Sequence, residues 1–85
     1  MRAPTLDQLN RLIDETLGLE GRGQSFDCAT PLLGGLPEFD SMAVVSLVTA
    51  LEERFGVRVQ DEDITAETFA TVGSLLAVLE QRAAA

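Results

Sequence analysis

The segment from Asp40 to Gly56 limits the fold of this chain most strongly, because both ends of a helix are marked in it. Aspartate is a favoured N-cap residue, and glycine is the usual residue just after a helix C-terminus. The apolar residues between them recur at helical intervals and place one group on a single side: Val44, Leu47, Val48, Leu51 and Phe55. The pattern predicts a helix over residues 41–55 that packs this face against a core.

Another helix is signalled near the start of the chain. Thr5 and Gln8 have the spacing of a capping box, in which each side chain binds the other residue's backbone N–H. Apolar residues then follow at helical intervals as far as Leu17, and Gly18 and Gly21 mark the end of the helix.

The C-terminal third of the chain offers two helix starts. Thr65 is placed to cap a short helix that ends at Phe69, and Thr71 to cap a longer helix after it. Gly73 lies inside the longer helix, where glycine costs about 1 kcal/mol relative to alanine, so we interpret it as a point of close packing. The predicted fold class is all-α: a four-helix bundle with three main helices, one short helix and a long first loop.

The long first loop covers residues 21–40 and is rich in glycine and proline. A loop of about twenty residues is unusual in a compact domain and is often functional. Its apolar side chains are expected to hold it on the helical core: Phe26, Leu32, Leu33, Leu36 and Phe39. Residues 1–85 then form a single domain, since the length leaves no room for a second one.

The charged residues exclude several functions. Fourteen acidic residues face six arginines, with no lysine and no histidine, for a net charge of −8. Without histidine or lysine, the common catalytic triads, a Schiff base and a P-loop cannot be built, and one cysteine makes no thiolate cluster. We therefore expect neither an enzyme nor a metal site. The charge disfavours nucleic acid, and it either favours basic protein partners or only maintains solubility.

The single cysteine, Cys28, excludes an internal disulfide and fits a reducing compartment. We expect it to be a small buried hydrophobic residue rather than a reactive thiol. Residues 1–10 lack the apolar centre of a secretion signal, and the longest apolar stretch holds about ten residues, half of what a membrane span needs. The prediction is a cytoplasmic protein without membrane insertion.

Ser41 directly follows the predicted N-cap, Asp40, in the first turn of helix 41–55. An anionic group on its oxygen would gain from the exposed backbone N–H groups and from the positive end of the helix dipole. Simple capping by the Asp-Ser pair is the competing interpretation.

The face of helix 41–55 opposite its core side carries Met42, Val45 and Glu53, while Glu52 lies at its edge. Two apolar residues on a solvent face favour a partner surface. Against this, single exposed apolar residues are ordinary in soluble proteins.

The sequence LPEFDSMAVVSLVTALEERFGVRV resembles the segment around the modified serine of acyl carrier proteins. Asp40-Ser41-Met42 corresponds to the Asp-Ser-Leu/Met core of that family, and an apolar helix ending in ALEERFG follows it. The similarity continues into LLGGLPEFDS on one side and DEDITAETFATVGSLLAVLE on the other. It covers roughly residues 6–79.

This resemblance implies a carrier rather than a catalyst. In the family, a phosphopantetheinyl transferase with its own magnesium moves 4′-phosphopantetheine from coenzyme A onto the serine, here Ser41, and the arm's thiol holds an acyl group as a thioester. Asp40 would cap the helix and be recognised by the transferase. The docking face for the transferase and for acyl-activating or acyltransferase enzymes would comprise Met42, Val45, Glu52 and Glu53.

The resemblance also implies that the core can open to shelter an acyl chain, although plain core packing explains its residues equally well: Leu51, Val59, Phe69 and Leu75. Fatty-acid-synthesis carriers usually have acidic residues two and five positions after the serine, where this chain has Ala43 and Ser46. Weaker electrostatic steering toward basic enzymes follows. A specialised pathway is therefore expected. The sequence of residues 36–57 is more similar to the carriers of bacterial exosortase-associated gene clusters.

Two alternatives stay open at this point. An aminoacyl or peptidyl carrier would use Ser41 in the same way, since the loading enzyme chooses the cargo. A small acidic helical adaptor without a prosthetic group would use Met42 and Val45 for protein binding alone. In each case the chain is expected to be a monomer.

Overall fold

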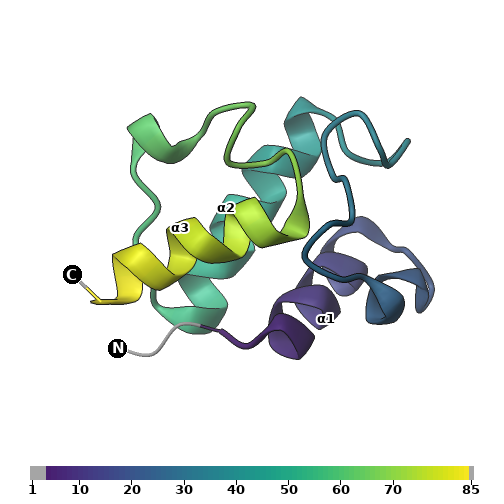
Figure 1. The fold of residues 1–85 in the computed structure, drawn as a ribbon, viewed down its shortest axis with the longest axis horizontal. Coiled ribbons are helices and arrows are strands. Elements are labelled where there is room, and N and C mark those ends of the chain that lie inside the picture. The colour runs from purple at the N-terminus through teal and green to yellow at the C-terminus, as the bar shows by residue number, and fades with distance from the viewer. Residues whose placement is uncertain (1–3, 85) are drawn as a thin grey trace.

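The computed structural model describes residues 4–84 and is all-α, as predicted (Figure 1). Residues 1–3, which belong to the stretch that lacks the apolar centre of a secretion signal, lie outside this range. The elements of the structure, in chain order, are α1 (Leu6–Leu17), η1 (Arg22–Ser25), α2 (Ser41–Phe55), η2 (Asp61–Asp63) and α3 (Val72–Ala84), where η marks a 3-10 turn. Among the described helices, none has both the length and the apolarity to cross a membrane.

The predicted start and end of the first helix are both confirmed. Thr5 Oγ1 accepts a hydrogen bond from the Gln8 N–H at 3.2 Å, and Gln8 Oε1 accepts one from the Thr5 N–H at 2.9 Å. At the other end of α1, Gly18 adopts the left-handed conformation, with φ of 65°. The capping box and the glycine therefore set both ends of this helix.

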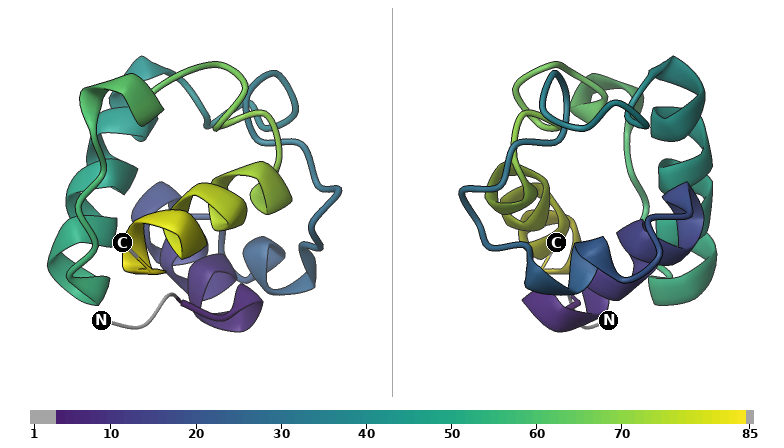
Figure 2. Two further views of the ribbon diagram at one scale, coloured as in Figure 1. Left: turned by 60° about the vertical axis from the view of Figure 1, so that its left-hand side comes forward. Right: turned by 90° about the vertical axis from the view of Figure 1, so that its right-hand side faces the viewer.

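The core lies where the three helices and the loops between them meet. In the right-hand view of Figure 2, α2 and α3 stand on opposite sides and α1 crosses below, while the connecting loops close the end at which α2 begins. The predicted face of α2 turns inward, with Leu47 and Leu51 fully buried and Val44, Val48 and Phe55 packed against the core.

The long first loop is held in place by the start of α3. The carbonyl of Thr30 accepts the Val72 N–H at 3.0 Å, and that of Cys28 accepts the Gly73 N–H at 2.9 Å. These bonds satisfy N–H groups that a helix start leaves without intrahelical partners. The first turn of α3 and the loop therefore stabilise each other.

Gly73 is a point of close packing, as predicted from its place inside a helix. A Cβ atom added there would lie 2.7 Å from the Cys28 carbonyl oxygen and 2.9 Å from the Cys28 Cβ. The expectation that Cys28 is buried was wrong, because the residue is exposed. Its backbone packs against α3 within a surface turn, in which the Thr30 N–H binds the Asp27 carbonyl at 3.1 Å.

The short fourth element differs in detail from the predicted helix over residues 65–69. Thr65 Oγ1 does accept the Thr68 N–H at 3.2 Å, and the Phe69 N–H reaches the Thr65 carbonyl at 3.2 Å. This makes one turn only, since the chain then extends to pair Thr71 with Pro31 in an isolated bridge. The second 3-10 turn, η2, lies just before it in a stretch that carried no clear helix signal.

Candidate functional site

Ser41 is the first residue of α2, and its side chain is exposed. The hydrogen bonds among residues 4–84 leave the backbone N–H groups of Ser41 and Met42 without a partner, and the Ser41 hydroxyl as well. A free hydroxyl thus lies beside two free donors at the positive end of a fifteen-residue helix. A phosphodiester on the Ser41 oxygen fits this arrangement, because its anionic oxygens would meet those donors.

Asp40 is the N-cap of α2, as predicted. One of its carboxylate oxygens accepts the Ala43 N–H at 2.9 Å, and its carbonyl accepts the Val44 N–H at 3.1 Å. The aspartate therefore supplies the capping, and Ser41 is not needed for it.

We expect Asp40→Ala to lower the free energy of unfolding by about 1 kcal/mol, because the Ala43 N–H loses its partner. Asp40→Asn should keep nearly full stability, since asparagine caps as well as aspartate. Urea unfolding of the three proteins checks this. An equal loss in both variants would show that the negative charge matters here rather than the cap.

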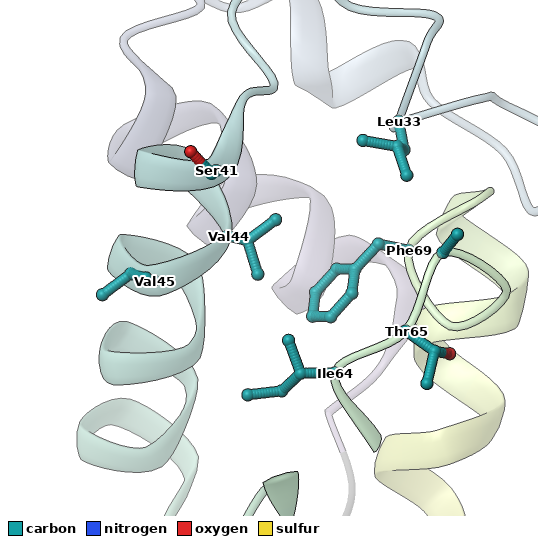
Figure 3. A pocket seen from close by; sticks show the side chains of 8 residues that line it. Leu33, Ser41, Val44, Val45, Ile64, Thr65 and Phe69 are labelled. Atoms are coloured by element: carbon teal, nitrogen blue, oxygen red, sulfur yellow. The ribbon is translucent and has the colours of Figure 1, made fainter. Parts of the chain in front are cut away.

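An apolar groove of about 420 Å³ opens beside Ser41, between the start of α2, the first loop and the segment before α3. Figure 3 shows Val44, Ile64 and Phe69 turned toward one another across it, with Leu33 facing them from the loop. The large exposed apolar residues of the described chain gather here or next to it: Leu33 (43% exposed), Met42 (70%), Val45 (62%) and Ile64 (42%). A patch of this kind on a small domain marks a binding surface.

The groove wall opposite α2 is held by an ion pair. Arg82 near the end of α3 binds both carboxylate oxygens of Asp63 at 2.7 Å, and Asp63 immediately precedes Ile64. The hydrogen bonds from Arg82 lower the pKa of the Asp63 carboxyl against the opposing effect of its burial. The same pairing raises the pKa of Arg82 above its ordinary value.

We expect this pair to make the folded state sensitive to acid. Because folding lowers the pKa of Asp63 below its ordinary value of 3.8, the stabilisation is complete above that value and is lost as pH falls through the folded pKa. Urea unfolding of wild type and Asp63→Asn, from neutral pH to about pH 2, should show a difference in stability that shrinks only in acid. A difference that stays constant over this range would contradict the assignment.

A second ion pair lies just before the site, on the loop that leads into Asp40. Arg22 of η1 donates to the Glu38 carboxylate and thereby lowers the pKa of Glu38. The pair ties two distant parts of the first loop together. Its side chains are 54% and 33% exposed, so its contribution to stability is screened by solvent.

The sequence-predicted docking residues divide into two groups. Met42, Val45 and Glu53 are exposed, as expected from the helical pattern. The carboxylate of Glu52 instead accepts the Val59 N–H at 3.0 Å and thereby anchors the segment that follows α2. Glu52 therefore has a structural contact in addition to any role at the surface.

Two groove residues, Leu33 and Ile64, were not identified as site residues from the sequence. Leu33 was expected to pin the loop onto the core, but its backbone N–H binds the Phe69 carbonyl at 3.0 Å and its side chain faces the groove. Ile64 is a lone apolar residue after the acidic run DED. An apolar residue isolated among charges was the only signal for it.

Comparison with known proteins supports this geometry. The family model described as the phosphopantetheine attachment site matches residues 7–79. An acyl carrier protein of Wolinella succinogenes is 49% identical over 41 residues, which is 48% of this chain and about half (51%) of that relative.

Solved structures with this fold include a holo acyl carrier protein from Nitrosomonas europaea, with 40% identity and a TM-score of 0.87 over 94% of this chain and 96% of that one. A chain in the crystal structure of an FAD-dependent dehydrogenase has 34% identity and a TM-score of 0.68, covering 84% of this chain and 97% of that one. The chain therefore belongs to the phosphopantetheine-attachment family of acyl carrier proteins, which carry a covalently bound 4′-phosphopantetheine and are not enzymes.

Proposed function

We propose that this chain is an acyl carrier protein in which Ser41 is the attachment point of 4′-phosphopantetheine. One observation carries the proposal: the Ser41 hydroxyl lies on the rim of an apolar groove, and neither it nor the backbone N–H groups of Ser41 and Met42 have a hydrogen-bond partner in the described part of the chain. The hydroxyl gives the attachment point, and the donors favour the phosphodiester. The groove gives an apolar carried group a place to lie.

The attachment is a phosphoryl transfer that another protein must catalyse, because the chain has no histidine or lysine to activate Ser41. The Ser41 oxygen forms the new P–O bond, the diphosphate bond of coenzyme A breaks, and adenosine 3′,5′-bisphosphate leaves. The serine proton passes to a base of the transferase. Once attached, the arm supplies a thiol that holds an acyl group as a thioester.

The chain's own residues position and present this site. Asp40 fixes the first turn of α2, and with it the direction of the Ser41 side chain. Met42 and Val45 offer exposed apolar contacts on the same turns, and we assign them, with Glu53, to the surface that the transferase and the acyl-loading enzymes contact. Glu52 adds charge beside this surface while it anchors residue 59.

A specialised pathway, rather than general fatty-acid synthesis, remains part of the proposal. The position two residues after Ser41 is the buried Ala43, and the position five residues after it is the exposed, neutral Ser46. Partner binding here relies more on apolar contact and less on charge than in carriers with acids at both places. We likewise propose a cytoplasmic monomer, on the single free cysteine and the small docking face.

The direct test is the intact mass of the protein before and after incubation with coenzyme A and a broad-specificity phosphopantetheinyl transferase. We expect the gain of one phosphopantetheine, located by fragmentation on the peptide that contains Ser41. A wild-type protein that stays unmodified by several transferases would contradict the proposal. The masses of thioesters on protein from its native cell would separate acyl from aminoacyl cargo.

A further inference from the structure

We propose that Glu52 couples the docking of a partner enzyme on α2 to a local release of the chain that follows this helix, at Val59. The inference rests on the proposed function, under which Glu52 lies beside the surface that the transferase and the loading enzymes contact. It adds a conformational response of the carrier itself, made by one carboxylate that can bind either the carrier's own backbone or a partner's cation.

The connection between α2 and η2, together with η2 itself, is tied to the helices by two side chains. In the described chain, every hydrogen bond that joins residues 57–63 to α2 or α3 is made by Glu52 or Arg82. The Glu52 carboxylate accepts the Val59 N–H at 3.0 Å, and the Arg82 guanidinium binds Asp63. Removing the Glu52 contact therefore frees the end of this connection that lies next to α2.

The two ties differ in how easily a partner can break them. The Arg82–Asp63 pair has two bonds of 2.7 Å, and the Asp63 side chain is only 11% exposed. Glu52, in contrast, is an exposed residue whose carboxylate receives one bond from a neutral N–H. An arginine of a docked protein offers the carboxylate two bonds and the opposite charge, which makes a stronger pair. A partner can therefore take Glu52 from Val59, while Arg82 keeps Asp63.

A basic side chain can reach Glu52 from solvent. The residue directly precedes the exposed Glu53, and it lines a hollow of about 490 Å³ between the end of α2 and η2. Asp61 and Glu62 line the same hollow, so three carboxylates face one guanidinium, that of Arg58. This excess of negative charge favours the approach of a partner's arginine or lysine.

The loss of Glu52 leaves the Val59 N–H without an acceptor. Val59 is only 9% exposed, and a backbone donor that is buried without a partner is unfavourable. The chain at Val59 must therefore move outward until water reaches this N–H. The movement stays local, because the side chain of Val57 is 2% exposed in the core on one side and Arg82 holds Asp63 on the other.

The test measures hydrogen exchange of the Val59 amide by NMR in wild type, Glu52→Gln and Glu52→Ala. Glutamine keeps an oxygen that accepts the Val59 N–H but has no charge for a partner's cation, whereas alanine removes both. In the free proteins we expect wild type and Glu52→Gln to exchange alike, and Glu52→Ala about tenfold faster, the factor for one lost hydrogen bond. With saturating phosphopantetheinyl transferase and no coenzyme A, wild type should become about tenfold faster and Glu52→Gln should not change.

Glu53→Gln is the matched control, because Glu53 is the neighbouring exposed carboxylate and accepts no hydrogen bond from the described chain. This variant should bind the transferase more weakly and still show the faster Val59 exchange when bound. The Gln60 amide is an internal reference: it binds Asp63 at 3.0 Å, so its exchange should stay nearly constant.

Val59 exchange that stays the same or slows when wild type binds the transferase would overturn the inference, and so would an equal acceleration in Glu52→Gln. If the same wild-type sample still gains the arm after coenzyme A is added, the proposed function stands in either case. Failure of the transferase to add the arm would contradict the proposed function itself.

Discussion

Ser41→Ala should abolish the addition of phosphopantetheine completely, with no change in fold. The substitution removes the hydroxyl oxygen that would carry the arm, next to the Ser41 and Met42 N–H groups that have no partner among residues 4–84. Stability should stay near the wild-type value, because Asp40 supplies the cap and the Ser41 hydroxyl has no hydrogen-bond partner in the described residues. Intact mass after incubation with coenzyme A and the transferase measures the loss, and circular dichroism measures the fold.

Ser46→Ala is the matched control for this experiment. Ser46 is also an exposed serine on α2, but it lies more than one turn further along and away from the free donors. It should accept the arm at the wild-type level. If Ser41→Ala were still fully modified, or if Ser46→Ala were the only variant to lose the modification, the attachment point would lie elsewhere. Either result would remove the basis of the proposal.

The helices of this protein are predictable from sequence because their signals are local. The Thr5–Gln8 capping box and the cap residues Asp40 and Gly56 each act within a few residues of chain, so they can be identified before any tertiary contact is known. The position of Ser41 at a helix start followed directly from them. The outward direction of Met42 and Val45 followed from the helical period of the apolar residues after them.

The groove was not predictable in the same way, because its walls come from three distant parts of the chain. Leu33 and Ile64 lie thirty-one positions apart, and the backbone bond from Leu33 to Phe69 brings the two walls together. Cys28 was wrongly assigned to the core because its residue type favours burial. The contact between its backbone and α3, which also joins distant parts of the chain, leaves the side chain exposed.

Helix propensity alone would make Gly73→Ala a stabilising change, and we expect the opposite. Replacing glycine by alanine inside a helix is worth about 1 kcal/mol. Here, however, the new methyl group would lie 2.7 Å from the Cys28 carbonyl oxygen, which belongs to the backbone and cannot rotate away. Relieving the contact requires the loop to move and stretches its bonds to the first N–H groups of α3. A net loss of about 1–3 kcal/mol in the free energy of unfolding follows, as for other overpacked sites.

Ala77→Gly separates the two effects, because Ala77 is exposed on the same helix. It should cost about 1 kcal/mol and thereby measure the propensity difference in this helix. Hydrogen exchange should show faster exchange of the Val72 and residue-73 amides in Gly73→Ala, since both donate to the displaced loop. If Gly73→Ala were instead more stable than wild type by the amount that Ala77→Gly loses, the loop would be free to yield. The first loop, and the Leu33 wall of the groove with it, would then not depend on α3 for its position.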